Sequence, residues 1–456
     1  MSFEWRSLTL GELCFEQGGS IQTGPYGSQL HTSDYVDVGV PVVMPTNIGD
    51  GGIATAGIAR IGAGDVERLT QHKLLAGDIV FSRRGDVTKN ALVRDFEAGW
   101  LCGTGCLKVR LGRAVAANPS FVSYSLRQPD IKDWLVRHAV GATMPNLNTG
   151  ILSAVPLTLP PLQSQLEIAT LLGALDDRIA QLRETNATLE AVAQALFKSW
   201  FVDFDPLRAK MAGRAPEGMD EATAALFPSD LTATEFGDLP AGWEMKPLSD
   251  VVEGVYDGPH ATPAEADAGP VFLGIKNLTG TALDLSDIRH IAESDWSRWT
   301  RRVIPQASDI VFSYEATLGF FALIPPGLRC CLGRRLALIR PRLQLGAPHF
   351  WLHQFTAAPF QRLLQKHTIQ GATVNRIALK EFPSYCVLSP PRGVQLAFDE
   401  RAASLWARIH ANQAQAQTLT TLRDTLLPRL ISGQLRLPLA DTPPAIAPPA
   451  RSPAPV

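Results

Sequence analysis

The pentapeptide DIVFS occurs twice in this 456-residue chain, at residues 78–82 and again at residues 309–313. Both copies are short apolar runs with β-branched and aromatic residues, which is the pattern of a buried strand. The first copy continues as RRGDVTKN and the second as YEATLGFF, so the sequences diverge directly after the strand. A repeated strand followed by two different loops indicates a duplicated scaffold.

Further matches keep nearly the same spacing as the two DIVFS copies. They are PVVMPTNI (41–48) with PVFLGIKNL (270–278), NPSF (118–121) with APHF (347–350), GAT (141–143) with GAT (371–373), and PPLQSQL (160–166) with PPRGVQL (390–396). The offset stays between 229 and 231 residues throughout. Chance matches would not keep this register, so the pattern predicts a tandem duplication.

Each copy has two parts. The first part consists of apolar runs broken by Gly, Pro, Asn and Asp, which predicts strands, turns and one or two short helices. The second part begins after the Pro-Pro pair, and its apolar residues recur in steps of four and three, which is a heptad seam. Each helix of about 40 residues would be about 60 Å long.

One asparagine on each seam indicates how the two helices pair. In an antiparallel pair Asn186 faces Asn412 while Leu182 faces Ala416. A parallel pair would place Asn186 opposite Ala416 and leave both amides unpaired. Because a buried seam asparagine usually fixes the register, we expect an antiparallel coiled coil with an Asn–Asn layer near its middle.

The composition predicts a globular protein of two to four domains, with 45% hydrophobic and 19% charged residues. No apolar run approaches the ~18 residues of a membrane span, so we expect a cytoplasmic protein without a membrane partner. The six cysteines show no C-x2-C pairs, which favours free thiols over a metal site. A net charge of −2 is low for a chain that binds nucleic acid alone. Binding to nucleic acid would need local basic patches and a partner that shares the neutralisation of phosphates.

The motifs of an enzyme are missing. NPSF is similar to the Asn-Pro-Pro-Tyr/Phe motif of amino-methyltransferases, but the second copy has APHF and no F-x-G-x-G loop precedes the motif. We therefore expect Asn118 to cap a helix with Pro119 in its first turn. There is also no G-x-x-x-x-G-K-[ST] phosphate loop. The sequence predicts no catalytic site and no cofactor.

The chain resembles the specificity subunit of a type I restriction–modification enzyme along its whole length except for the C-terminal tail. The motifs that carry the resemblance are TGPYGSQL (23–30), GDIVFSRRG (77–85), GATMPNLN (141–148), LPPLQSQLEIATLLGALDDRI (159–179) and the connector FVDFDPLRAK…PEGMDEATAALFP…GDLPAGW. The second copy departs from the pattern with PPRGV at its helix start and SYEATLG in place of SRRGDVT.

The resemblance implies a non-catalytic subunit that recognises a bipartite DNA sequence, one half-site per target-recognition domain. It also implies that two methyltransferase subunits dock on the helices and that restriction subunits join for ATP-dependent cleavage. The alternative is a stand-alone DNA-binding or scaffold protein without methyltransferase partners.

The expected fold class is α/β (α+β), with two similar recognition domains separated by two long helices and related by a pseudo-two-fold axis. The expected divisions are recognition domain 1 (1–160), a spacer helix (161–205), a connector (206–242), recognition domain 2 (243–390), a second spacer helix (391–437) and a disordered Pro/Ala-rich tail (438–456).

Candidate DNA-binding residues lie on the loops after the predicted strands. Arg and Lys bind guanine edges or phosphates, Asn binds adenine, and Glu accepts from a cytosine amine. An arginine after a strand is also compatible with a surface salt bridge. The candidates in copy one are Tyr26, Ser28, Gln29, Thr46, Asn47, Arg83, Arg84, Thr88, Lys89 and Asn90, and those in copy two are Tyr256, His260, Lys276, Asn277, Arg301, Arg302, Tyr314, Glu315 and Thr317.

The end of the first long helix carries an unusually aromatic segment, FKSWFVDF at residues 197–204. Phe197, Trp200 and Phe201 must pack on something. Their own recognition domain is one possible partner. We favour a docked methyltransferase subunit as the other.

Overall fold

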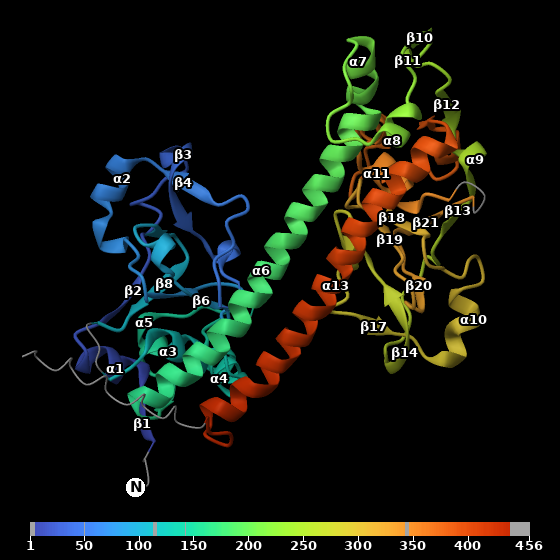
Figure 1. Ribbon diagram of the computed structural model, residues 1–456. Helices are drawn as coiled ribbons and strands as arrows, with labels where there is room; N and C mark the ends of the chain where they lie inside the picture. The colour runs from blue at the N-terminus through green and yellow to red at the C-terminus, as the bar shows by residue number, and fades with distance from the viewer. Residues whose placement is uncertain (1–4, 50, 113–115, 142, 343–345, 438–456) are drawn as a thin grey trace, which may run out of the picture. The chain divides into compact units, whose positions relative to one another are not determined.

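The computed structural model describes residues 5–49, 51–112, 116–141, 143–342 and 346–437. The chain divides into a first unit, Met1–Ala180 with Thr418–Val456, and a second unit, Gln181–Gln417. Each unit contains one set of β-sheets together with a stretch of each of the two long helices (Figure 1).

Among its described residues, the first unit contains three sheets and five short helices. Its central sheet has the strand order β2-β8-β5-β6, a second sheet has the order β4-β3-β7, and β1 pairs with β9. The strands are β1 (Arg6–Thr9), β2 (Ser20–Thr23), β3 (Tyr35–Val43), β4 (Ala59–Ile61), β5 (Ile79–Ser82), β6 (Asn90–Leu92), β7 (Leu101–Cys102), β8 (Cys106–Arg110) and β9 (Pro156–Leu159). The helices are α1 (Leu10–Glu16), α2 (Ala63–Arg68), α3 (Pro119–Ser125), α4 (Pro129–His138) and α5 (Thr149–Ser153).

The second unit repeats these three sheets in the same order. The central sheet is β13-β21-β18-β19, the second is β17-β14-β20, and β12 pairs with β24. The strands are β12 (Glu244–Pro247), β13 (Val252–Asp257), β14 (Ala266–Leu273), β17 (Arg289–His290), β18 (Ile310–Ser313), β19 (Phe321–Leu323), β20 (Cys330–Leu332), β21 (Leu336–Pro341) and β24 (Cys386–Ser389). The two DIVFS copies are the equivalent strands β5 and β18, which confirms the predicted duplication.

Smaller elements complete the second unit. They are α9 (Leu248–Val251), α10 (Trp296–Trp299), α11 (Pro348–Thr356), α12 (Ala358–Lys366), and the hairpins β15 (Leu278–Thr279) with β16 (Ala282–Leu283) and β22 (Thr368–Ile369) with β23 (Arg376–Ile377). The connector contains α7 (Asp205–Met211), α8 (Glu221–Ala225) and the hairpin β10 (Leu231–Thr234) with β11 (Gly237–Pro240), more structure than the sequence indicated.

Strands β5 and β18 are buried on both faces. The aspartate that opens each DIVFS segment, directly before the strand, makes the same contact in both units, which helps to explain why the sequence is repeated. In the first unit Asp78 accepts hydrogen bonds from Nε and Nη2 of Arg110 on β8, at 2.8 and 2.6 Å. In the second unit Asp309 accepts the same two bonds from Arg340 on β21, at 2.8 and 2.7 Å. Such a bidentate pair fixes the alignment of the two central strands.

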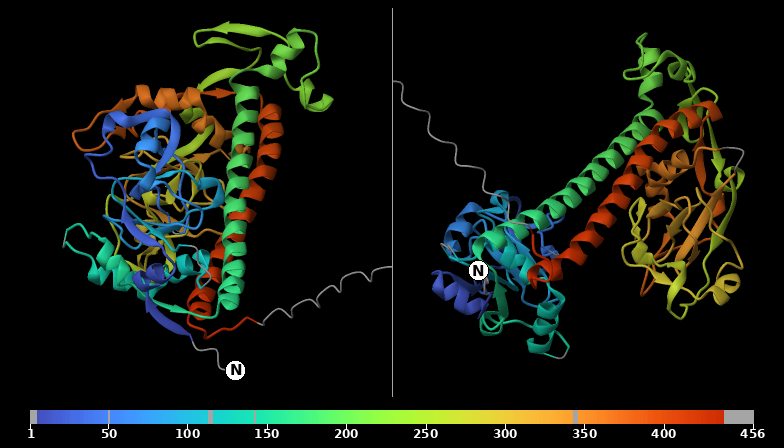
Figure 2. Two further views of the ribbon diagram at one scale, coloured as in Figure 1. Left: turned by 90° about the vertical axis from the view of Figure 1, so that its left-hand side faces the viewer. Right: turned by 60° about the horizontal axis from the view of Figure 1, so that its bottom comes forward.

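The long helices are α6 (Leu162–Phe201) and α13 (Arg392–Ile431), and both views in Figure 2 show them alongside each other. Each begins after a Pro-Pro pair, and a buried glutamine stabilises each start. Gln165 Nε2 donates to the Pro160 carbonyl at 2.8 Å, and Gln395 Nε2 donates to the Pro390 carbonyl at 2.7 Å. The repeated glutamine of the PPxxxQL motif is therefore a helix-start device.

Contacts within the second unit show that the helices run antiparallel. Asn186 of α6 lies beside Asn412 of α13, while Trp200, further along α6, contacts Phe398, which precedes Asn412 on α13. Helix α6 ends at Phe201, before the expected residue 205, because Phe204 adopts a left-handed conformation with φ of 56°. The expected disordered tail, 438–456, lies outside the described residues.

Within the described part of the chain, no helix combines the length and the apolar character that crossing a membrane requires. The six cysteines are free, and all except Cys386 are buried. The described residues contain no group of three or more His, Cys, Asp and Glu side chains suited to holding a metal ion.

Candidate nucleic-acid interface

The loops after β2 and β5 leave the central sheet of the first unit at the same edge. Both strands pair antiparallel with β8, so both end beside the start of that strand. Gly24 N donates to the Cys106 carbonyl at 2.9 Å. Arg83 N donates to the neighbouring Gly105 carbonyl at 2.8 Å. The loops TGPYGSQL and RRGDVTKN, far apart in sequence, therefore begin side by side.

The loop after β3 joins the same edge. Gly103 N donates to the Val43 carbonyl at 2.9 Å. A Cβ atom on Gly24 would lie 2.0 Å from the Gly103 carbonyl oxygen, so this approach requires glycine. We call the three loops after β2, β3 and β5, with the turn Gly103–Gly105, the first loop edge.

An antiparallel pairing of Val140 with Asn146 borders the first loop edge. Val140 and Asn146 exchange two backbone hydrogen bonds of 3.0 Å. Asn146 Oδ1 also accepts from Arg83 Nε at 3.3 Å, and Leu147 N donates to the Arg83 carbonyl at 2.9 Å. The GATMPNLN motif thus lies against the loop that follows DIVFS.

The second unit builds an equivalent second loop edge around the turn Gly333–Arg335. Gly258 N donates to the Leu336 carbonyl at 2.9 Å, and Tyr314 N donates to the Arg335 carbonyl at 3.2 Å. Gly333 N donates to a β14 carbonyl, that of Leu273, at 2.8 Å. The bordering hairpin is β22–β23, joined to the edge by Ile377 N donating to the Tyr314 carbonyl at 2.8 Å.

The two loop edges share their backbone hydrogen bonds and differ in their side chains. Each edge therefore offers a different set of donors, acceptors and charges on the same scaffold. The equivalent positions, first edge then second, are Thr23 and Asp257, Tyr26 and His260, Thr46 and Lys276, Arg84 and Glu315, Thr104 and Arg334, Gly105 and Arg335, and Asn146 and Arg376.

Two carboxylates organise cations on the second loop edge. Asp257 accepts a hydrogen bond from Arg302 and lies 3.1 Å from Nε2 of His260. Glu315 Oε2 lies 3.4 Å from Nε of Arg335. Each of these carboxylates pairs with a basic group and orients it. An unpaired carboxylate at a nucleic-acid interface would repel phosphate, so the pairing accounts for the presence of acids here.

On the first loop edge Asp86 organises the loop after β5. Its Oδ1 accepts from both N and Oγ1 of Thr88, at 3.1 and 2.6 Å, and its Oδ2 lies 3.9 Å from Nζ of Lys89. In the loop after β2, Gln29 Oε1 accepts from Tyr26 N at 3.1 Å. Gln29 and Thr88 therefore shape the loops with their side chains, while Tyr26 and Lys89 remain exposed.

Most of the candidate residues lie at a surface. Exposed side chains in the first unit are Tyr26, Ser28, Thr46, Arg84 and Lys89, with Gln29, Arg83 and Thr88 half-buried. Exposed side chains in the second unit are His260, Lys276, Arg301, Arg302 and Thr317, with Tyr256 and Glu315 half-buried.

Three candidate asparagines are buried, which corrects their predicted role as adenine readers. Asn47 Oδ1 accepts from Met44 N at 3.0 Å, and its Nδ2 donates to the Ala54 carbonyl at 3.1 Å. Asn277 makes the same kind of bonds in the second unit. Asn90 is fully buried on β6. Because their amides are used within the fold, these residues close turns and pack strands.

Tyr314 is a fourth correction, because its side chain is 7% exposed. Burial, with the nearby Asp257 and Glu315 carboxylates, raises the pKa of Tyr314 to about 12. Its hydroxyl has no hydrogen-bond partner among the described residues. The Tyr314 ring is part of the core beneath the second loop edge, so its hydroxyl is not presented to a ligand.

Sequence reasoning missed the turn at the centre of each loop edge and the antiparallel pairing that borders it. Thr104, Arg334, Arg335, Asn146 and Arg376 lie there and were not among the candidates. The signal was available, since LCGTGC (101–106) and CLGRRL (331–336) fall in the register of the duplication. It was weak because only one glycine is shared between the turns.

The aromatic segment at the end of α6 is buried within the second unit. Phe197, Trp200 and Phe201 are at most 4% exposed, in a core that also contains Phe398 of α13 and Phe350 of α11. This corrects the prediction that they dock a methyltransferase subunit. The alternative interpretation, that these residues pack against their own recognition domain, agrees with the structure.

Two other expectations are confirmed. Asn412 Nδ2 donates to Asn186 Oδ1 at 2.8 Å, which is the predicted Asn–Asn layer. Asn118 Oδ1 accepts from Phe121 N at 2.9 Å, so NPSF is a helix cap. In the second unit Asp399 of α13 replaces this cap, accepting from His349 N at 2.7 Å.

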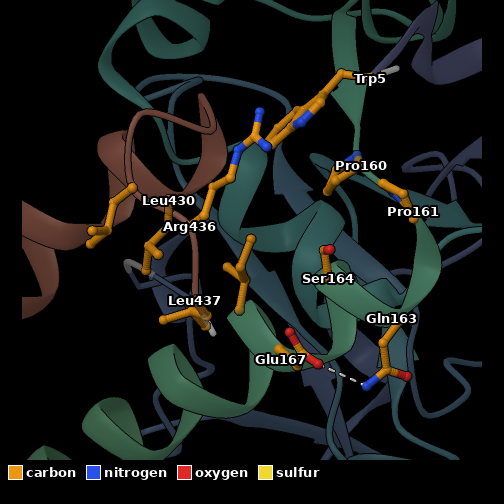
Figure 3. A pocket seen from close by; sticks show the side chains of 11 residues that line it. Trp5, Pro160, Pro161, Gln163, Ser164, Glu167, Leu430, Arg436 and Leu437 are labelled. Carbon is orange, nitrogen blue, oxygen red and sulfur yellow. Dashed lines mark hydrogen bonds between the residues drawn. The ribbon is translucent and has the colours of Figure 1, made fainter. Parts of the chain in front are cut away.

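A separate pocket of about 560 Å³ lies in the first unit at the start of α6, away from the loop edge. Figure 3 shows Trp5 and Arg436 along one side, with Pro160 and Pro161 nearby. Gln163 and Glu167 line it and share a hydrogen bond of 2.9 Å. The pocket contains none of the predicted DNA-binding residues.

Comparison with known proteins agrees with this architecture. Residues 4–191 match the family model described as the type I restriction modification DNA specificity domain. This match and the curated relatives support a specificity subunit of a type I restriction–modification system. The MjaIX specificity subunit of Methanocaldococcus jannaschii is 24% identical over 406 residues, covering 82% of this chain and 88% of that protein.

A second relative and a solved structure are also similar to this chain. The HindI specificity subunit of Haemophilus influenzae is 24% identical over 345 residues, covering 66% of this chain and 73% of that protein. The crystal structure of a type I system S subunit from M. genitalium has a TM-score of 0.53 at 15% identity, covering 94% of this chain and 96% of that structure. The structural match shows a shared fold.

Proposed function

We propose that this specificity subunit recognises a bipartite DNA sequence, with one half-site bound at each loop edge. The observation that carries the proposal is the pairing of equivalent loop edges, one per unit, whose backbones match while their side chains differ. A fixed scaffold with exchangeable side chains suits two different short sequences. In this proposal residues 1–160 and 243–390 are the two recognition domains.

Charge is concentrated locally, in spite of a net charge of −2 for the whole chain. The second loop edge carries the exposed arginines Arg302, Arg334 and Arg376. Phosphate contacts by such groups supply much of the affinity for DNA. A near-neutral total charge then implies that partner subunits neutralise the remaining phosphates.

The chain is proposed to act without chemistry of its own, so that methylation and ATP-dependent cleavage belong to methyltransferase and restriction subunits. The long helices supply equivalent positions for the methyltransferase subunits. Among the described residues, four large apolar side chains on α6 and α13 are exposed, namely Leu166, Val192, Leu396 and Leu422. They form two pairs, each separated by 230 residues. Two equivalent apolar surfaces fit two copies of one partner.

The test is a map of DNA methylation in the host with and without this chain. We expect one split adenine-methylation motif to disappear when the chain is deleted. If no split motif disappears, the proposed function is wrong. If the purified chain binds a split sequence equally well without methyltransferase subunits, a stand-alone DNA-binding protein is the better description.

A further inference from the structure

The two loop edges differ in charge at the turn between β20 and β21. The first unit has Gly103–Thr104–Gly105 at this place and the second has Gly333–Arg334–Arg335. Each turn contacts the neighbouring loops through the same backbone hydrogen bonds. Two arginines therefore occupy the centre of the second loop edge.

The backbone of Arg335 is in the left-handed region, with φ of 76°, and the equivalent Gly105 has φ of 82°. Glycine adopts this region freely, whereas a residue with a Cβ atom is disfavoured there. An arginine in such a conformation is maintained against the preference of its backbone. Residues of this kind concentrate at functional sites.

Arg335 Nε is buried without a hydrogen-bond partner among the described residues. Glu315, on the adjacent loop, forms an ion pair with it. Its Oε2 lies 3.4 Å from Arg335 Nε, and the two side chains are about equally exposed, at 29% and 30%. The terminal amino groups of Arg335 have no acceptor among the described residues. Two parallel N–H donors of an arginine match the O6 and N7 acceptors of guanine in the major groove.

Arg334 differs from its neighbour in being exposed and without an ion-pair partner among the described residues. An exposed cation without an ion-pair partner suits a phosphate, which carries no sequence information. A cation held by a carboxylate suits a base edge, because direct readout depends on a defined geometry.

We propose that Arg335 is the specificity-determining residue for a guanine in the second half-site, with Glu315 as its positioning residue and Arg334 as a phosphate contact. The proposal rests on the proposed function of the two loop edges.

The main experiment replaces Arg335 with glycine in the full chain, assembled with its methyltransferase subunits, and maps adenine methylation. We expect one guanine position in one half-site to lose about 10- to 100-fold of its discrimination. The other half-site and the gap should not change. Arg335→Gly is expected to fold well because glycine suits the local φ, and thermal unfolding checks this. Arg335→Asn, which also tolerates this region, is the second variant.

Three further variants separate the roles. Glu315→Gln should reduce discrimination at the same guanine position and leave the sequence preference of the other half-site unchanged. Arg334→Ala should lower methylation at all sites by a similar factor. Arg362→Ala removes the same charge from an exposed position on α12 and should leave the motif unchanged.

Two results would overturn the inference. They are a guanine preference that survives in both Arg335 variants, or a second half-site that contains no guanine. Either outcome leaves the proposed function intact, because a split motif is still read. Absence of any split motif with the unmodified chain would instead remove the proposed function itself.

Discussion

Asn412 and Asn186 form a hydrogen-bonded layer between the two long helices of the second unit. Asn412 Nδ2 donates to Asn186 Oδ1 at 2.8 Å, and Asn186 Nδ2 donates to the Ile409 carbonyl at 3.3 Å. Asn412 is 2% exposed, so its amide depends on this partner. The layer fixes which residues face one another along the helices.

Replacing one partner of this layer should cost more stability than replacing both. Asn186→Leu leaves Asn412 buried without its acceptor, and we expect a loss of about 1–3 kcal/mol. Replacing both residues by leucine should be nearly neutral or stabilising. A double-mutant cycle by urea denaturation measures the coupling. Additive single losses would show that the two amides do not depend on each other.

The buried aspartate at the start of each DIVFS segment should be essential to the stability of its unit. Asp309→Ala leaves Arg340 unpaired with a side chain only 15% exposed, so we expect the second unit to lose about 3–5 kcal/mol. The matched change, Asp78→Ala, should cost less because the Arg110 side chain is 32% exposed and can be hydrated. Chemical denaturation of the two variants gives the comparison. Equal losses would contradict the explanation by solvation.

Removing exposed apolar side chains from the long helices should reduce the number of docked methyltransferase subunits. Val192→Asp and Leu422→Asp change duplicated positions, and we expect each to lower the count from two copies to one. Native mass spectrometry measures the count. Glu184→Lys, an exposed charge change on α6, is the control. Retention of two copies in both variants would place docking elsewhere.

A change in the buried aromatic segment should act on stability and not directly on docking. Phe201→Ala opens a cavity beside Phe350 and Phe398, and we expect a loss of about 3–5 kcal/mol in the second unit. Differential scanning calorimetry measures this loss. A stable variant that fails to bind methyltransferase would restore the docking interpretation.

Stability of the second unit should fall as the pH drops below about 6.5. Burial lowers the pKa of His353 to about 3, because the charged form is desolvated, and the nearby His349 lowers it further while Asp399 raises it. His353 Nε2 accepts from Trp406 Nε1 at 3.1 Å, which the neutral ring allows. The unfolded chain therefore binds a proton between pH 6.5 and about 3 that the folded chain does not.

The expected slope from this group is about 1.4 kcal/mol of lost stability per pH unit within that window, and no dependence above it. His410, whose pKa burial also lowers, contributes in the same direction. His353→Gln keeps an acceptor for Trp406 and should flatten the decline between pH 7 and pH 5. Denaturant midpoints at the two pH values test this. An unchanged slope would exclude His353 as the cause.

The first half-site should depend on Arg84. This arginine is exposed at the position that Glu315 occupies in the second unit. Arg84→Ala should weaken or relax one half-site, by about 1–3 kcal/mol if it contacts a base, and leave the other half intact. Arg83→Ala should act similarly and also loosen the bond to Asn146. Equal loss at both halves would indicate a role in the fold or in partner binding.

Periodicity and register were sufficient to predict much of this architecture from sequence. The heptad seams and one asparagine per seam predicted the antiparallel helices, because only one pairing satisfies both amides. The repeated spacing predicted the duplicated sheets. The loops after DIVFS were recognised as divergent, since the flanking strand keeps its pattern while the loop does not.

Local pattern did not separate exposed polar residues from buried ones. Asn47, Asn90 and Asn277 have the same sequence features as a reading asparagine, yet their amides bind the backbone inside the fold. The aromatic residues Phe197 and Trp200 likewise found their partners in α13 and α11, far along the chain. Such assignments depend on which segments meet, and sequence spacing does not specify this.

The sequence by itself determined that one scaffold is used twice, because strand and helix periods are local properties that any duplicated segment retains. Only the tertiary structure decided which side chains share an edge. Antiparallel pairing with β21 places Gly258, Tyr314 and Arg335 together across 77 residues of chain. The loops that diverge after DIVFS therefore lie at a sheet edge, where they meet loops from distant strand ends. At this edge Arg335 of the second unit occupies the position of Gly105 in the first.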